Sequence, residues 1–288
     1  MLTRPQQVAL LAPFGVLVGL ALVLPMLLGL LSSFTNYGPG EIELQLTGVQ
    51  NYSRLLADPE FAIAARNVVI FTAVAVPAEL AVGFALASLL RSPFRGRRIV
   101  RVLFLLPWLV SPIASGVMWR FLLGAPGGLF EFALALLHRP AQSSPAGQPG
   151  LALATVVAIE VWRMAPLVAF LLLPAMERIP SERFDEARLN GAGAFMTART
   201  IVLPALRPLL LTVAMLLVGL SLGTFDAVLI LTGGGPGSET MTPALYSYQQ
   251  AIQSNAWPIG VAAAWLIVAA VALIGTAYVR GTRARYTA

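Results

Sequence analysis

The side chains of this chain that could do chemistry are few, and several lie inside long apolar stretches. Glu160 and Arg163 are three residues apart, so on a helix they lie one turn apart and can form an ion pair. Trp162 lies between them, and its aromatic face could stack on a sugar ring. An ionisable group at membrane depth costs about 2.5–3.5 kcal/mol, so such groups usually face a bundle interior or water. These residues fit either a polar solute path or an ion pair that holds helices together.

A second polar group occupies residues 225–236. Asp226 follows Phe225 and precedes a glycine-rich run that reads Thr232, Gly233, Gly234, Gly235 and Pro236. The carboxylate of Asp226 could hydrogen-bond a hydroxyl-rich solute, or it could anchor the run. Nothing places the glycines between a strand and a helix, as a phosphate cradle requires, so we interpret the run as a tight external turn.

Two further ionisable residues stand alone in apolar stretches. Glu79 either pairs within the protein or contacts a ligand, and we expect the internal pairing. Arg120 lies near the end of its stretch, where a long side chain can extend to the membrane interface.

The sequence disfavours an enzyme. It contains no cysteine and one histidine, His138, and Gly219-Leu-Ser221-Leu-Gly223 matches the letters of a nucleophile elbow only within a hydrophobic stretch. Every basic residue is an arginine, and a chain without lysine cannot form the phosphate loop of an ATPase. We therefore expect no catalytic residue, no metal site and no cofactor bound by this chain.

Composition identifies the class of protein that must position these side chains. Of 288 residues, 58% are hydrophobic and only 11% are charged, about half the charge of a soluble domain, and the mean hydropathy is +0.80. Apolar runs of about 20 residues are long enough to cross a bilayer as helices. We predict an all-α integral membrane protein whose single domain covers residues 1–288. Its six transmembrane helices are expected near 8–33, 67–90, 99–123, 151–175, 205–231 and 257–280.

The charges between the spans set the expected orientation. The second connection carries five arginines and no acid, namely Arg91, Arg95, Arg97, Arg98 and Arg101. The fourth connection and the tail after residue 280 are also rich in arginine, whereas the odd-numbered connections are poor in it. Positive residues favour the cytoplasmic side, so we predict that both termini are cytoplasmic. This topology accounts for the net charge of +6 without nucleic acid as a partner.

Proline and glycine predict how the spans are shaped and packed. Five prolines fall inside spans, where each removes a backbone donor and bends its helix, namely Pro25, Pro77, Pro107, Pro112 and Pro166. Gly15-x-x-x-Gly19 and Gly219-x-x-x-Gly223 would allow helices to approach closely.

The fourth connection contains a polar segment, residues 181–207, between two apolar runs. It predicts two short helices, within residues 181–199, separated by a glycine break. Phe184, Ala187, Gly191 and Phe195 fall at helical spacing on one face, with charged residues on the others. A surface of this kind is suited to docking into a groove of a partner.

The same segment resembles the EAA loop of ABC importer permeases, whose pattern is E-A-A, three residues, G, nine residues and I-x-L-P. Asp185, Glu186 and Ala187 take the E-A-A positions, and Gly191 takes the glycine position. The tail of the pattern is matched by Ile201, Leu203 and Pro204. Two departures stand out, because Asp185 replaces glutamate and Glu186 replaces alanine, which adds a charge.

Other segments resemble the same family, and within it the branch of the larger permeases of maltose-type importers. They are Gly48 with Asn51 and Tyr52, Arg101 with Pro107 and Trp108, and the run Leu231–Pro236. The resemblance implies the type I permease fold in the prokaryotic cytoplasmic membrane. It implies that Phe184 and the EAA-like residues couple the chain to a cytoplasmic ATPase.

The resemblance also implies partners, namely a second permease, two ATP-binding subunits that hold ATP and Mg, and an external solute-binding protein. The expected cargo is a sugar or oligosaccharide, with glycerol phosphate or a phosphodiester as the alternative. A stand-alone secondary transporter is the competing hypothesis, but no inverted repeat is found and six spans are few for one chain working alone.

Overall fold

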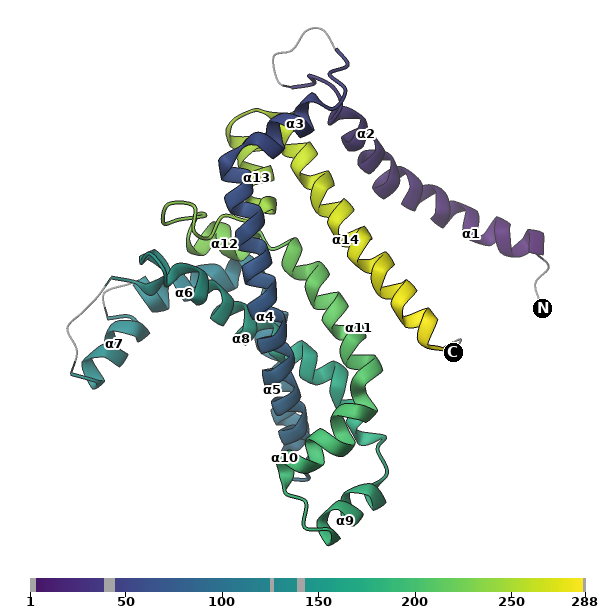
Figure 1. The fold of residues 1–288 in the computed structure, drawn as a ribbon, viewed down its shortest axis with the longest axis vertical. Helices are drawn as coiled ribbons and strands as arrows, with labels where there is room; N and C mark the ends of the chain where they lie inside the picture. Colours follow the sequence, from purple (N-terminus) through teal and green to yellow (C-terminus); the bar gives the residue numbers. More distant parts are fainter. Residues whose placement is uncertain (1–3, 39–44, 125–126, 139–142, 287–288) are drawn as a thin grey trace. The chain divides into compact units, whose positions relative to one another are not determined.

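The computed structural model describes residues 4–38, 45–124, 127–138 and 143–286, and side chains for residues 10–38, 45–124, 127–138 and 143–281. The described residues are helical nearly throughout (Figure 1). Within these ranges the only β pairing is an isolated antiparallel bridge between Thr35 and Leu46. The helices are α1 (Arg4–Val18), α2 (Leu24–Ser32), α3 (Gln50–Ala57), α4 (Pro59–Arg91), α5 (Arg97–Leu109), α6 (Pro112–Gly124), α7 (Leu129–Leu136), α8 (Ala152–Glu177), α9 (Ser181–Leu189), α10 (Ala194–Thr197), α11 (Leu203–Leu222), α12 (Asp226–Leu231), α13 (Pro243–Tyr248) and α14 (Trp257–Tyr286).

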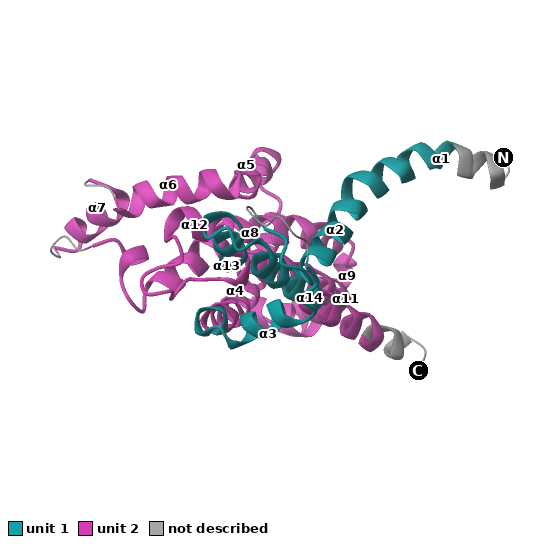
Figure 2. Ribbon diagram, turned by 90° about the horizontal axis from the view of Figure 1, so that it is seen from above, with its two compact units in different colours: residues 1–62, 246–269 teal, residues 63–245, 270–288 magenta. Residues whose placement is uncertain are grey.

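The chain forms two compact units (Figure 2). Unit 1 contains residues 1–62 and 246–269, and unit 2 contains residues 63–245 and 270–288. Helices α4 and α14 each contribute residues to both units, so neither unit is a continuous stretch of sequence. The single permease domain over residues 1–288 stays a prediction.

Six helical stretches in the described part of the chain are long and apolar enough to cross a membrane, which confirms the all-α membrane fold. They are Leu10–Ser32, Pro59–Arg91, Pro112–Leu136, Ala152–Glu177, Ala194–Leu222 and Trp257–Gly281. The first runs through a π-helical turn, Gly19–Val23, between α1 and α2. The arginines expected in the tail include Arg283 and Arg285, whose side chains lie outside the described residues.

The third span differs from the continuous helix expected over 99–123. The chain breaks between α5 and α6, because Val110 is extended (φ −70°, ψ 130°) and Pro112 begins a new helix. Ser111 precedes Pro112, and the proline ring disfavours the helical region at that position, which favours a break here. By contrast, Pro107 lies inside α5, and Pro77 and Pro166 lie inside α4 and α8.

The fifth span begins and ends earlier in the chain than the expected 205–231. Helix α11 ends at Leu222, and α12 starts afresh at Asp226. The amide of Gly223 donates to the carbonyl of Leu220 at 3.2 Å, and the carbonyl of Thr224 accepts from the hydroxyl of Thr242 at 2.8 Å. These bonds satisfy backbone groups that a continuous helix would have paired internally.

The core of unit 2 is built on α8. Val168 and Leu172 of α8 are fully buried, as is Leu217 of α11. Gly83 of α4 packs directly on α8, because a Cβ at that position would lie 2.5 Å from Cγ1 of Val168 and 2.9 Å from the carbonyl oxygen of Ala165. Close packing at α8 therefore fixes the positions of the ionisable side chains that this helix carries.

Unit 1 is held by a few buried polar contacts. The side-chain amide of Asn51 donates to the carbonyls of Ser33 and Thr35, at 2.8 and 2.9 Å. The hydroxyl of Tyr246 donates to Asp58, whose other oxygen accepts from the amide of Glu60 at the start of α4. These bonds tie the residues after α2, helix α3 and the start of α4 to α13.

Candidate functional site

The polar segment after α8 forms two short helices, α9 and α10, joined at Gly191. The amide of Gly191 donates to the carbonyl of Arg188 at 2.9 Å, and the amide of Ala192 donates to the carbonyl of Ala187 at 2.8 Å. This pair of bonds is a Schellman motif, which requires a left-handed residue after the helix end. Gly191 has φ +73°, a conformation that glycine adopts without the steric cost of a side chain. The glycine of the EAA-like pattern therefore has a definite role in the turn.

Only part of the predicted face of this segment points inward. Ala187 is buried, and the ring of Phe184 packs against the core cluster of unit 2. The guanidinium of Arg91 lies over that ring, 3.6 Å from its centroid. Phe195, which the spacing placed on the same face, is 78% exposed, because the turn at Gly191 redirects the chain before α10 begins.

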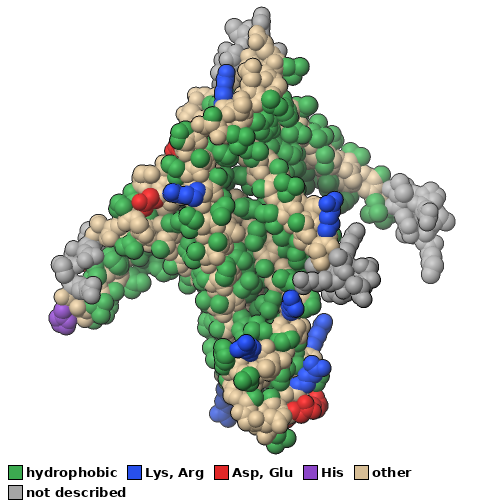
Figure 3. Space-filling view, viewed as in Figure 1, with side chains coloured by type: hydrophobic (Ala, Val, Ile, Leu, Met, Phe, Trp, Pro, Cys, Tyr) green, Lys and Arg blue, Asp and Glu red, His purple; other side chains and the backbone are tan. Residues whose placement is uncertain are grey.

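The outward side of the segment is both charged and apolar. Asp185 and Glu186 are exposed, and Asp185 pairs with Arg188 at 3.3 Å on the surface. Leu189 is 88% exposed beside them. In Figure 3, acidic and basic side chains gather together at the end of unit 2 that α9 and α10 form. Exposed leucine and phenylalanine among charges are typical of a surface that another protein covers.

The tail of the EAA-like pattern leads from this surface into the next long helix. Ile201 lies in a π-helical turn, Ala198–Val202, and packs against the core. Leu203 and Pro204 follow this turn directly and lie in the first turn of α11. A cavity of about 540 Å³ lies beneath the segment and is lined by residues of α4, α8, α9 and the chain from Ala192 to Val202.

The structure brings Glu160 and Arg163 together as a buried ion pair on α8. Nη2 and Nε of Arg163 donate to the two carboxylate oxygens of Glu160, at 2.5 and 3.1 Å. The side chains are 7% and 15% exposed. Glu79 of α4 interacts electrostatically with both charges, yet its two buried oxygens accept no hydrogen bond from any residue that the structure describes. Glu79 thus lies beside the pair without being bonded to it.

Trp162 stands against a second tryptophan. The rings of Trp162 and Trp119 meet edge to face, with centroids 5.4 Å apart. Both rings line a cavity of about 310 Å³, and Trp162 also lines a separate cavity of about 370 Å³ that includes Phe104. The indole N–H of Trp119 is buried and has no acceptor in the described part of the chain, so a donor is available there. Trp119 was not predicted to line a path with Trp162, because it lies on a different span.

The glycine-rich turn is held by threonines, and Asp226 takes no part. The hydroxyls of Thr232 and Thr240 lie 2.7 Å apart, and Thr240 donates to the carbonyl of Gly235 at 2.8 Å. Gly233 and Gly234 have φ +64° and +93°, and Pro236 follows Gly235 through a cis peptide bond. Among the described residues no hydrogen bond to the carboxylate of Asp226 is found, although it lies at the first position of α12 next to Phe225.

An asparagine that the sequence did not single out braces the same turn from α4. The side-chain amide of Asn67 donates to the carbonyls of Ser238 and Met241, at 2.8 and 3.1 Å. Nearby, the amide of Gly150 donates to the carboxylate of Glu239 at 2.7 Å. Arg120 reaches the carbonyl of Ile230 on α12, at 3.4 Å. No signal in one sequence marks pairs this far apart in the chain. Among the described residues, no cluster of three or more histidines or carboxylates could hold a metal ion.

Comparisons with known proteins agree with this arrangement of helices. Residues 79–285 match the family described as binding-protein-dependent transport system inner membrane component. The trehalose/maltose transport system permease protein of Thermococcus litoralis is 32% identical over 209 residues, which cover 72% of this chain and 70% of that protein. The sulfoquinovosyl glycerol transport system permease protein of Agrobacterium fabrum is 27% identical over 279 residues, which cover 96% and 90%.

A solved structure shares the fold. A chain in the crystal structure of a bacterial alginate ABC transporter, in complex with an alginate pentasaccharide-bound periplasmic protein, superposes with a TM-score of 0.79. The match covers 94% of this chain and 91% of that chain at 18% identity. The match confirms the predicted permease fold.

Proposed function

This chain belongs to the family of binding-protein-dependent transport system inner membrane components, and we propose that it forms half of the solute path of an ATP-driven sugar importer. It is a multi-pass permease subunit of the cytoplasmic membrane. The relative from Thermococcus litoralis is named for trehalose and maltose, which supports a sugar or oligosaccharide as the cargo. ATP and Mg belong to a separate ATPase in this proposal.

The α9–α10 segment is the proposed contact with the ATPase. Its exposed face carries Asp185, Glu186, Leu189 and Phe195, which offer charged and apolar groups to a groove. Its buried face carries Phe184, held by Arg91 at the end of α4. A push on the exposed face therefore acts on α4 directly, and this contact is the observation that carries the proposal.

The proposed orientation follows from the same segment. An ATPase is cytoplasmic, so the arginine-rich connections at 91–101 and 178–207 face the cytoplasm together with both termini. The external side then carries the Thr232–Pro236 turn, where a solute-binding protein would dock. A second permease is needed to complete the path, because six spans of one chain supply only half of it.

The solute path is proposed to run along α8, beside Trp162, Trp119 and the Glu160–Arg163 pair. Aromatic faces suit the apolar faces of sugar rings, and the buried indole N–H of Trp119 could donate to a sugar hydroxyl. Phe225 and Asp226 remain path candidates, because the carboxylate of Asp226 is committed to no hydrogen bond among the described residues. Glycerol phosphate or a phosphodiester is the second candidate cargo.

Two glycines of the same loop test the coupling. Gly191 has φ +73°, whereas Gly193 has φ −71°, and a Cβ at either would meet no atom within 4 Å. Gly191→Ala therefore strains the turn by about 1–2 kcal/mol, while Gly193→Ala strains nothing. The complex with its second permease, ATPase and binding protein would be reconstituted in vesicles, and ATP hydrolysis and solute uptake measured together.

We expect Gly191→Ala to lower the uptake per ATP hydrolysed severalfold, with Gly193→Ala close to wild type. Equal effects of the two substitutions, or uptake by the chain without an ATPase, would refute the coupling proposal. Competition by neutral oligosaccharides against glycerol 3-phosphate in the same vesicles assigns the cargo class.

A further inference from the structure

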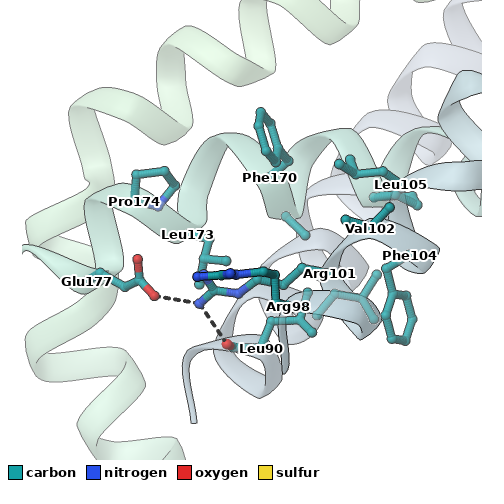
Figure 4. Close-up of a pocket in the computed structure, with 13 residues that line it drawn as sticks. Leu90, Arg98, Arg101, Val102, Phe104, Leu105, Phe170, Leu173, Pro174 and Glu177 are labelled. Carbon is teal, nitrogen blue, oxygen red and sulfur yellow. Dashed lines mark hydrogen bonds and ion pairs between the residues drawn. The ribbon is translucent and has the colours of Figure 1, made fainter. Parts of the chain in front are cut away.

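A groove between α5 and α8 ends in arginines that the proposed function does not use. It also touches the end of α4 and has a volume of about 230 Å³ (Figure 4). Its walls are apolar, formed by Leu90, Val102, Leu105, Phe170, Leu173 and Pro174. One end is polar, where Arg98 and Arg101 of α5 lie near Glu177 of α8. The groove is therefore amphipathic along its length.

The polar end carries more positive charge than the protein neutralises. Arg97 and Arg101 share the single carboxylate of Glu177, at 3.1 and 2.5 Å. Arg98 is exposed and has no ion pair or hydrogen bond among the described residues. The Nε of Arg101 is buried and finds no acceptor within the described ranges, although its Nη2 donates to the carbonyl of Leu90 at 3.1 Å. Three guanidinium groups against one carboxylate leave an anion-binding end with unused donors.

The charged end of the groove lies at the ends of its helices. Helix α4 ends at Arg91, α5 begins at Arg97 and α8 ends at Glu177, so the charges lie where these helices end. The apolar walls extend from there along the membrane-length part of α8. Pockets that enclose a whole small molecule usually measure about 300–1,000 Å³, so this groove suits part of a larger amphiphile.

We infer that the groove is a binding site for an anionic phospholipid, whose phosphate is held by Arg98 and Arg101 and one of whose acyl chains lies against α5 and α8. Basic pockets between helices at the cytoplasmic side are suited to such headgroups. A zwitterionic lipid has the same chains, but its cationic group would face the arginines. The site should therefore select by headgroup charge.

The test uses the full-length chain purified in a mild detergent. Phosphatidylglycerol and phosphatidylcholine with identical acyl chains are titrated, and bound lipid is counted by native mass spectrometry. We expect phosphatidylglycerol to bind at least about fivefold more tightly, the equivalent of about 1 kcal/mol per basic residue at a membrane surface. Arg98→Gln should remove most of that preference.

Arg95→Gln is the matched control, because Arg95 is an exposed arginine of the same connection that does not line the groove. Arg95→Gln and Arg98→Gln each remove one positive charge, so both weaken the non-specific attraction of this connection for anionic lipid equally. Arg95→Gln should therefore change phosphatidylglycerol binding by less than about twofold. Val102→Trp tests the apolar part. Val102 is 59% exposed and lines the groove, so the larger ring should block the acyl chain and weaken binding while leaving every arginine in place.

Equal binding of the two lipids, equal losses in Arg98→Gln and Arg95→Gln, or unchanged binding in Val102→Trp would each overturn the assignment. Displacement of phosphatidylglycerol by millimolar inorganic phosphate would overturn it as well, because it would identify an anion site without a lipid. None of these outcomes depends on whether the chain transports a sugar.

Discussion

The guanidinium of Arg91 lies 3.6 Å from the centre of the Phe184 ring, so the last residue of α4 covers a side chain of α9. Phe184 also packs against the buried cluster that includes Met176 and Val202. The contact joins the surface segment to a helix of membrane length. Any displacement of α9 must therefore either move the end of α4 or break the contact.

The energy of this contact can be measured by a double-mutant cycle. Arg91→Gln and Phe184→Leu should each lower the free energy of unfolding. The double variant should lose less than the sum of the two single losses, and the difference should be about 0.5–1 kcal/mol, the usual strength of an exposed cation–π contact. Unfolding in detergent gives the four stabilities. Arg95→Gln combined with Phe184→Leu is the control pair, and its effects should add. Additivity in the Arg91 cycle would mean that the two residues are neighbours without a binding interaction.

Helix packing makes a second prediction at Gly83. An alanine there would place its methyl group 2.9 Å from the backbone oxygen of Ala165 and against the branched side chain of Val168, neither of which can swing away. We expect Gly83→Ala to lower the free energy of unfolding by about 1–3 kcal/mol, the usual cost of overpacking. Gly219→Ala is the control, because the nearest atom to its methyl group is 3.9 Å away. It should be neutral or stabilising by up to about 1 kcal/mol, since alanine favours helix.

These glycines show where the sequence was insufficient. The spaced pair Gly15 and Gly19 predicted close helix contact, yet within this chain a Cβ at either would meet nothing within 4 Å. The closest approaches occur at Gly83, Gly234 and Gly260, which belong to no such pattern. Close packing depends on which side chain lies opposite, and a single sequence does not contain that information.

Hydropathy predicted the number of spans because the requirement for apolar length is local. It did not place the interruptions. Pro107 and Pro112 look alike in the sequence, but the first stays inside α5 and the second starts α6. The glycine at 191 was recognised, yet its consequence for Phe195 was missed, because a left-handed turn ends the helical spacing on which the predicted face depended.

The Glu160–Arg163 pair makes a third prediction that separates its two interpretations. Glu160→Gln alone leaves Arg163 as an uncompensated buried charge, which typically costs about 3–5 kcal/mol. Replacing both, as Glu160→Gln with Arg163→Met, should cost less than the single change, because no lone charge is left behind. Unfolding in detergent and uptake in vesicles would be compared for both variants.

Both residues lie on α8, so a purely structural pair would stabilise that helix, and its loss would lower uptake in proportion to stability. A pair that lines the solute path would lose uptake in the double variant even where stability is retained. A double variant less stable than Glu160→Gln would contradict the argument that an uncompensated buried charge is the larger cost.

The bond between Tyr246 and Asp58 predicts a dependence on alkaline pH. Burial raises the pKa of the Tyr246 phenol above its ordinary value of 10, and the hydrogen bond to the Asp58 carboxylate raises it further. Below pH 10 the phenol is protonated in both the folded and unfolded states, so the bond stabilises fully. Above pH 10 the unfolded state releases the proton while the folded state keeps it, so stability falls as pH rises, by up to about 1.4 kcal/mol per pH unit.

Thermal unfolding of the wild type and Tyr246→Phe between pH 8 and 11 would show this. At pH 8 the wild type should be more stable by about 1.5–3 kcal/mol, the usual value of a hydrogen bond to a charged acceptor, and the difference should shrink steadily above pH 10. Tyr37→Phe is the control, because the Tyr37 ring is 60% exposed, and it should follow the wild type at every pH. A stability difference for Tyr246→Phe that is the same at pH 8 and pH 11 would contradict this prediction. It would show that folding does not raise the pKa of the phenol and that the contact with Asp58 contributes packing alone.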